Sequence, residues 1–152
     1  MVFPSATPSV IEAVSIVEEY GALTEAMFLV MAVERRMLNV QRQLLRGALD
    51  VLSNGRVRTA HMEAMLDAAS RRLAEDGWEK RCQRVLESLR RDAIHGESTL
   101  VLAAAVAAAE RKITPAERSV LERFARELGV AETRLDEVLH ELTEDEEPPP
   151  AG

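Results

Sequence analysis

Apolar residues recur along this chain at intervals of three and four, the spacing that places side chains on one face of an α-helix. The clearest stretch is 101–129, in which an alanine-rich segment ends at a short charged turn and a second apolar stripe follows. The pattern predicts helices over about 9–20, 23–36, 40–53, 59–76, 78–95, 97–111, 115–128 and 132–142. We therefore expect an all-α, single-domain helical bundle of about seven or eight helices.

The second half of this stretch carries the most complete set of helix boundary signals. Thr114 can accept a hydrogen bond from the backbone N–H of Glu117, and the Glu117 side chain can reach back to the Thr114 N–H, which together form a capping box. Pro115 occupies the first helical position, where no backbone donor is needed. Gly129 supplies the left-handed residue that ends the helix.

The boundaries of the earlier helices rest on single residues. Ser9 is the predicted N-cap of the first helix, Gly21 is predicted to end it, and Thr59 is the predicted N-cap of the fourth. In the first helix, one side carries Val10, Val14 and Val17. In the third helix, the apolar face is predicted to consist of Leu44, Leu45, Ala48, Val51 and Leu52.

Composition and length agree with one helical domain. The chain has 152 residues, and only 3% of them are aromatic, whereas residues with straight side chains and alanine dominate. Residues 9–142 are predicted to form the helical domain. Residues 1–8 contain two prolines and are predicted to be a flexible arm, and the acidic, proline-ended segment 143–152 is predicted to be disordered.

The central hairpin has a counterpart upstream. Residues 32–45 align with residues 108–121 without gaps at an offset of 76, so that apolar positions match and a Glu-basic-basic turn matches itself. Arg42 then corresponds to Arg118, and Gln41 corresponds to Glu117. Amphipathic hairpins resemble one another by chance, but we favour a duplication. A duplication predicts two helical hairpins related by a pseudo-twofold axis.

At these residues the chain resembles the tellurite-resistance TerB family, including the TerB-like domain of some membrane-anchored J-domain co-chaperones. The motif is Ala109-Glu110-Arg111-Lys112-Ile113-Thr114-Pro115-Ala116-Glu117, and residues 33–41 follow it more loosely. The resemblance covers roughly residues 23–142. It implies an all-helical bundle, a link to tellurite or other chemical stress, and membership of multiprotein assemblies at the inner face of the membrane.

The resemblance also implies a metal site. The paired acidic residues of that family have been proposed to hold a divalent cation, and here the matching positions are Glu34, Glu110 and Glu117. Glu34-Arg35 and Glu110-Arg111 stand where the family has Asp-Gly, so basic residues lie beside the acidic ones, and the first copy has Gln41 in place of a glutamate. The competing interpretation is that Glu117 caps its helix and that Glu110 is a solvated turn residue paired with a neighbouring arginine. We prefer this interpretation and expect no cofactor.

A basic region raises a third possibility. Residues 56–91 contain nine basic and six acidic residues in a chain whose formal net charge is −7. The basic residues within 71–91 could bind nucleic acid or anionic lipid, but acidic residues are interleaved with them and no aromatic residue is placed to stack on bases. A solvated surface is the simpler interpretation.

The remaining reactive side chains give no catalytic pattern. Cys82 follows Trp78 by one helical turn on an apolar stripe, which predicts a packed thiol; an exposed thiol beside Lys80 and Arg81 would instead favour a redox sensor. The three histidines are far apart and are expected at the surface or at helix ends. We expect no enzyme activity.

These observations lead to one preferred function and leave several questions open. The chain has no cysteine pair and no apolar leader, and its longest apolar run, 100–109, is about half a bilayer span, so a cytoplasmic protein is expected. The preferred function is a non-catalytic TerB-like interaction or scaffold module with a protein partner in a stress-response assembly. One alternative is a divalent-metal-binding sensor or metal-dependent module that uses Glu34, Glu110 and Glu117, and a second is a nucleic-acid-binding regulator that uses the basic region 71–91. The sequence leaves open whether the alanine face of 100–109 packs within one subunit or in a homodimer.

Overall fold

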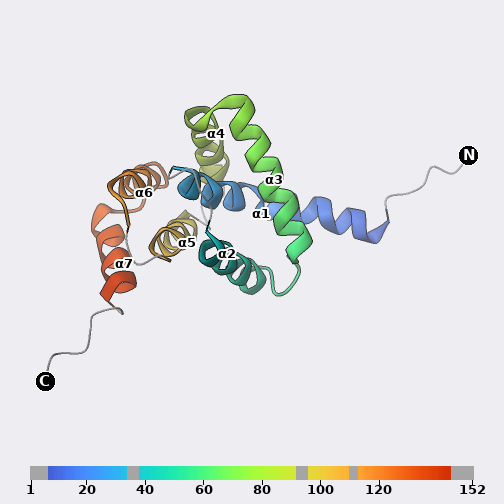
Figure 1. Cartoon of the computed structure of the whole chain (residues 1–152), viewed down its shortest axis with the longest axis horizontal. Helices are drawn as coiled ribbons and strands as arrows, with labels where there is room; N and C mark the ends of the chain where they lie inside the picture. The colour runs from blue at the N-terminus through green and yellow to red at the C-terminus, as the bar shows by residue number, and fades with distance from the viewer. Residues whose placement is uncertain (1–6, 34–37, 92–95, 110–112, 145–152) are drawn as a thin grey trace, which may run out of the picture.

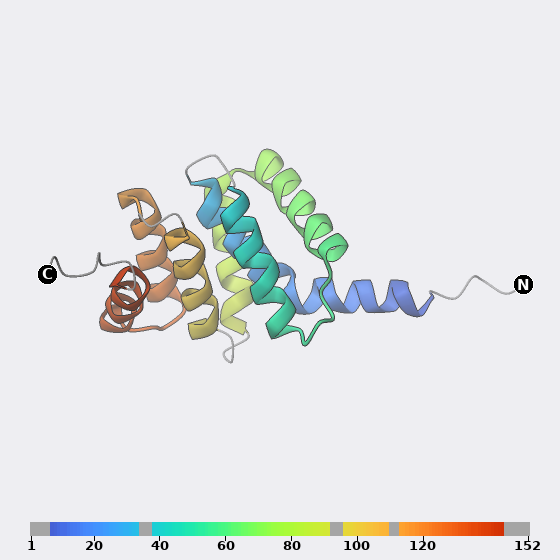
Figure 2. The ribbon, with the colours of Figure 1, turned by 60° about the horizontal axis from the view of Figure 1, so that its bottom comes forward.

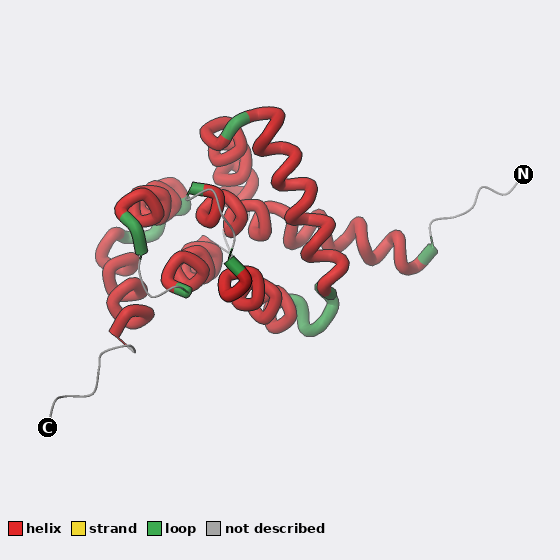
Figure 3. The backbone as a smooth tube through the Cα atoms, in the orientation of Figure 1, coloured by secondary structure: helices red, strands yellow, loops and turns green. Residues whose placement is uncertain are grey.

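The computed structural model describes residues 7–33, 38–91, 96–109 and 113–144, and within these ranges it contains seven α-helices and no strand (Figures 1 and 3). The helices are α1 Pro8–Ala32, α2 Asn39–Leu52, α3 Thr59–Asp76, α4 Trp78–Arg91, α5 Gly96–Ala108, α6 Pro115–Glu127 and α7 Glu132–Glu144. The predicted all-α helical bundle is confirmed.

The bundle is built around two helices, α1 and α5, which pack against each other. Helices α3 and α4 cover α1, helices α6 and α7 cover α5, and α2 lies along α5 on another side (Figure 1). The alanine face of α5 faces this core: Ala103, Ala104 and Ala107 are buried. Small side chains allow neighbouring helices to approach closely. The alanine face of 100–109 therefore packs within one subunit, which settles the point that the sequence left open.

Helix α1 is one continuous helix of 25 residues, where the sequence predicted two helices separated at Gly21. That prediction was wrong. A glycine inside a helix costs about 1 kcal/mol relative to alanine, but it does not stop the helix when packing holds both sides. Ile16 and Tyr20 are buried before Gly21, and Thr24 and Glu25 are buried after it. The N-terminal part of α1 extends beyond the rest of the bundle (Figure 2).

Two predicted N-caps were each wrong by a residue or two. Thr7, rather than Ser9, caps α1: its Oγ1 accepts a hydrogen bond from the Val10 N–H at 3.3 Å, and a proline follows it at the first helical position. In α3 the cap is Arg58, and Thr59 is the first helical residue. At the other end of the chain α7 continues to Glu144, so the helical region is two residues longer than 9–142 at that end.

The boundary signals around the central hairpin are confirmed. The Glu117 N–H donates to Thr114 Oγ1 at 3.1 Å, and the Thr114 N–H donates to Glu117 Oε1 at 3.0 Å, which forms the predicted capping box. Gly129 has a φ of 75°, the left-handed conformation expected after a helix. Asn54 and Gly55 likewise have positive φ and close the turn after α2.

The two copies of the sequence repeat share one local feature. Gln41, which aligns with Glu117, accepts a hydrogen bond from the Leu38 N–H at 3.1 Å, as Glu117 does from Thr114. Both side chains are buried. The Gln41 Nε2 also donates to the carbonyl of Val106 at 3.3 Å, which ties α2 to α5. A pseudo-twofold relation between the complete hairpins stays a prediction.

Candidate binding groove and its surroundings

Helix α2 carries more apolar residues than one face can bury. Leu45 and Leu49 are fully buried, whereas Val51 is 79% exposed and Leu44 and Leu52 are exposed as well. The sequence placed Leu44, Val51 and Leu52 in the core and omitted Leu49, so the buried face was assigned wrongly. A second apolar stripe on α2 therefore faces outward.

This stripe forms one wall of a groove between α2 and α5 with a volume of about 830 Å³. Helix α5 forms the other wall, and one residue of α7 closes an end. The lining residues are Gln43, Leu44, Gly47, Ala48, Val51, Leu52, Glu97, Ser98, Val101, Leu102, Ala105 and Arg134. The two helices run beside each other in both ribbon views (Figures 1 and 2), and the groove extends along them from residue 43 to 52 of α2 and from 97 to 105 of α5.

Small residues give this groove its depth. Gly47 lies in the middle of α2, and a Cβ atom added there would meet no other atom within 4 Å. Ala48 and Ala105 line the same groove. At one end the guanidinium of Arg134 donates to Glu97 Oε1 at 2.6 Å and to Glu137 Oε2 at 3.2 Å. These hydrogen bonds raise the pKa of Arg134. The groove is therefore lined mainly by apolar residues, with Gln43 and Ser98 also in its lining and a salt bridge at one end.

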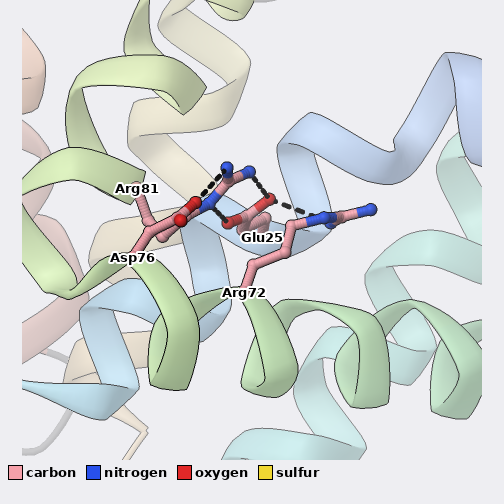
Figure 4. A network of polar contacts seen from close by, with 4 residues as sticks. All are labelled: Glu25, Arg72, Asp76 and Arg81. Carbon is pink, nitrogen blue, oxygen red and sulfur yellow. Dashed lines mark hydrogen bonds and ion pairs between the residues drawn. The ribbon is translucent and has the colours of Figure 1, made fainter.

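A polar cluster joins α1, α3 and α4 on another side of the molecule (Figure 4). The Glu25 carboxylate of α1 is buried and accepts from Arg81 of α4 at 2.7 and 2.9 Å. Arg72 of α3 donates to the same carboxylate at 3.1 Å. Arg81 also donates to Asp76 at 3.2 Å, and the hydrogen bonds that Arg81 donates to Glu25 are the main cause of its raised pKa.

The chemistry of this cluster is structural. Both Glu25 oxygens accept hydrogen bonds from guanidinium groups, which stay protonated at all physiological pH values. Such a carboxylate is occupied and does not serve as a free base. Because its four members come from three helices, the cluster fixes the position of α1 relative to α3 and α4. Two arginines of the basic region that could bind nucleic acid or anionic lipid, Arg72 and Arg81, are thus engaged by carboxylates within the protein.

Cys82 lies in the core beside Trp78 and Arg123. Its side chain is fully buried, and burial raises the pKa of the thiol to about 11 although the nearby Arg123 guanidinium acts in the opposite direction. Trp78 donates its indole N–H to the carbonyl of Leu29 at 3.0 Å, and Arg123 lies 5.9 Å from the centre of its ring. These contacts support the interpretation of Cys82 as a packed thiol.

A thiol-modifying reagent tests this interpretation. We expect Cys82 in the folded protein to react with an aromatic disulfide at pH 8 at least 100-fold more slowly than in urea, because it is buried and protonated. Reaction can be followed by the absorbance of the released thiolate. Labelling at the same rate in both conditions would show that Cys82 is accessible.

The three residues of the predicted metal site are only partly visible. Glu34 and Glu110 lie outside the described residues, so a metal site formed by these two residues and Glu117 stays a prediction. Glu117 itself is buried and participates in the capping box. Within the described ranges, no group of three or more His, Cys, Asp or Glu side chains is placed to hold a metal ion.

Other predicted features have clear positions. His61 accepts a hydrogen bond from the Arg58 N–H through Nδ1 at 3.0 Å, as a residue of the first turn of α3. His95 lies outside the described residues, and His140 is exposed on α7. In the basic region, Arg91 pairs with Glu87 on the helix surface at 3.0 Å. None of the described helices combines the length and apolar character needed to cross a bilayer.

The fold and the groove define the class of this protein as a helical bundle with an open apolar trough on its surface. No protein-family model, curated protein or solved structure matches the chain.

Proposed function

We propose that this protein is a non-catalytic interaction module whose α2–α5 groove binds an amphipathic helix of a protein partner. The observation that carries the proposal is the second apolar stripe of α2, with Val51 79% exposed at its end. Water contact with this stripe is unfavourable by about 25 cal/mol per Å² of apolar surface. An exposed stripe of this kind beside a groove is typical of a binding surface.

The shape of the groove favours a helix over a compact ligand. Its lining residues run from Gln43 to Leu52 on α2 and from Glu97 to Ala105 on α5. At 1.5 Å per residue these segments are roughly 12–14 Å long, which matches two to three turns of a docked helix. Helices that bind in such grooves present apolar side chains at intervals of three and four residues. A partner of this kind would complete the apolar packing of α2.

The cellular context of the proposal rests on the TerB resemblance alone. That resemblance supports a role as a TerB-like scaffold in a tellurite or chemical stress response, in the cytoplasm and near the membrane. The groove itself is independent of this context. The proposal of a helix-binding groove therefore stands even if the stress-response part fails.

Filling the groove at Gly47 tests the proposal. Gly47→Glu places a large charged side chain in the trough, in a position where a Cβ atom has open space, so the fold is expected to persist. We expect binding of a partner helix to weaken at least tenfold, because the introduced carboxylate must either lose its water on binding or push the partner helix out of the groove. The partner is first recovered from the native host with the unaltered chain, and a peptide of its binding segment is then titrated against both proteins by calorimetry.

Gly47→Ala is the matched control. It leaves the groove open and is expected to raise the free energy of unfolding by about 0.5–1 kcal/mol, because alanine loses less backbone entropy than glycine in a helix. Binding should be unchanged in this variant. Equal affinity of the peptide for Gly47→Glu and the unaltered chain would show that the partner binds elsewhere, and a binding segment that is not helical would also overturn the proposal.

A further inference from the structure

A second hollow, the α1–α3–α4 pocket, lies beside the Glu25 cluster and has a volume of about 370 Å³. Glu25, Arg72 and Arg81 line it at the end where they bind one another. The buried side chains of Met65 and Val85 form part of its lining. Pockets that hold small molecules in proteins measure about 300–1,000 Å³, so its size suits a small ligand.

Small residues keep this pocket open. Gly21, Ala22, Ala64 and Ala68 all line it. A Cβ atom added to Gly21 would meet only a methyl group of Val17, at 3.7 Å, which is an ordinary contact. Packing within the chain therefore does not demand glycine at this position, although glycine weakens a helix relative to alanine. Gly21 enlarges the pocket just as Gly47 deepens the α2–α5 groove.

Two arginines of the pocket have hydrogen-bond donors to spare. A guanidinium carries five N–H donors, and Arg72 directs one of its nitrogens at Glu25. Its outer nitrogen points away from the other three residues of the cluster (Figure 4). Arg84 also lines the pocket, and it forms no ion pair with a carboxylate in the part of the chain that the structure describes. The pocket thus combines unused cationic donors with a lining of small apolar residues.

The balance of charge favours a singly charged anion. Three arginines and two glutamates line the pocket, which leaves one positive charge in excess. Both oxygens of Glu25 are taken by Arg81, at 2.7 and 2.9 Å. The other glutamate, Glu18, is seven residues from Glu25 on α1, about 10 Å along the helix. A carboxylate near Arg72 would match this excess charge, whereas a doubly charged phosphate would exceed it.

We propose that the α1–α3–α4 pocket binds a small aliphatic monocarboxylate. Its carboxylate accepts hydrogen bonds from Arg72 and Arg84, since a guanidinium matches the geometry of a carboxylate. Its apolar chain lies along Gly21 toward Val17, at the opposite end of the pocket from the Glu25 cluster. No aromatic residue is present in this lining, so a nucleotide base has nothing to stack on. The pocket shares no residue with the α2–α5 groove, and either proposal can fail without the other.

A methyl NMR titration with octanoate tests this proposal. We expect saturable chemical-shift changes at Val17 and Val85, with a dissociation constant below about 1 mM, and no change at Val51 and Val101 of the α2–α5 groove. Octylammonium has the same type of chain with the opposite charge and should not bind, and neither should inorganic phosphate. The proposal is overturned by the absence of saturation up to about 10 mM octanoate. Changes confined to the groove, or equal binding of octylammonium or phosphate, would also overturn it.

Variants of α1 and α4 test which residues hold the ligand. Arg84→Gln should weaken octanoate binding by about fivefold or more, because it removes one cation from the pocket. Arg84 is exposed, so the fold should persist, and circular dichroism checks this. Arg90→Gln is the matched control, since Arg90 is exposed on the same helix outside the lining and should leave binding unchanged. Gly21→Leu fills the pocket with a better helix former and should abolish binding. Equal affinities of the Arg84 and Arg90 variants, or full binding to Gly21→Leu, would place the ligand elsewhere.

Discussion

Replacing Arg81 with alanine is expected to lower the free energy of unfolding by about 3–5 kcal/mol. The Arg81 side chain is only 13% exposed and makes two hydrogen bonds to the buried carboxylate of Glu25. Without Arg81, this carboxylate keeps one partner, Arg72, whose side chain is partly in water. An ionised group left in the core without sufficient hydrogen bonds is strongly destabilising, and the loss should appear in urea unfolding followed by circular dichroism.

Arg84→Ala provides the matched control for this experiment. Arg84 lies on the same helix and is exposed, so the variant removes the same charge and should change the free energy of unfolding by less than about 0.5 kcal/mol. Combining Glu25→Leu with Arg81→Met should recover much of the loss, since apolar replacement of a whole buried ion pair is often neutral. Equal effects of Arg81→Ala and Arg84→Ala would contradict the structural role of the cluster.

Phe124→Ala is expected to lower the free energy of unfolding by about 3–5 kcal/mol as well. Phe124 is a fully buried aromatic side chain on α6, and α6 contacts α5, α7, α1 and α4. Removing its ring loses the transfer free energy and leaves a cavity that rigid helices fill only in part. A lower midpoint in urea with an unchanged slope would show that the folded state is weakened while the unfolding stays cooperative.

Val51→Ala is the control for the cavity. Val51 is 79% exposed, so its truncation should change the free energy of unfolding by less than about 0.5 kcal/mol. A loss below about 1 kcal/mol for Phe124→Ala would show that α6 is not anchored in the common core. Two separate transitions in this variant would show that α6 and α7 unfold apart from the rest.

The all-helical class and the boundary signals of the central hairpin could be predicted because their signals are local. The capping box of Thr114 and Glu117 and the left-handed Gly129 depend on residues within a few positions of one another. The break predicted at Gly21 failed because packing before and after the glycine holds α1 together, and packing is set by residues far away in the sequence.

The candidate groove could not be predicted from the sequence as a site, although a signal was present. Helix α2 has apolar residues on two stripes, and a sequence alone does not say which stripe meets the core. Val51 was assigned to the core because the two apolar stripes of α2 were treated as one face. Leu49, which was left out of that face, belongs to the buried stripe. An apolar surplus on a short helix is the signal that would have indicated a second contact surface.

The polar cluster was missed for a similar reason. Arg72 and Arg81 were considered as part of a surface for nucleic acid, because the basic region was compared only with its own neighbours in sequence. Their partner, Glu25, lies 47 and 56 residues away on α1. The burial of Glu25, which calls for a cation partner, is produced by packing of α1 against α3 and α4 and so is not visible in the neighbouring sequence.

The most direct test of the helix-binding groove is a methyl NMR titration of the chain with the helical segment of its partner. The structure predicts large chemical-shift changes at the methyl groups of Leu44, Val51 and Val101, which line the groove. The buried methyl groups of Val138 on α7 should stay in place. Changes confined to other surfaces, with the three groove residues unaffected at saturation, would contradict the proposed function.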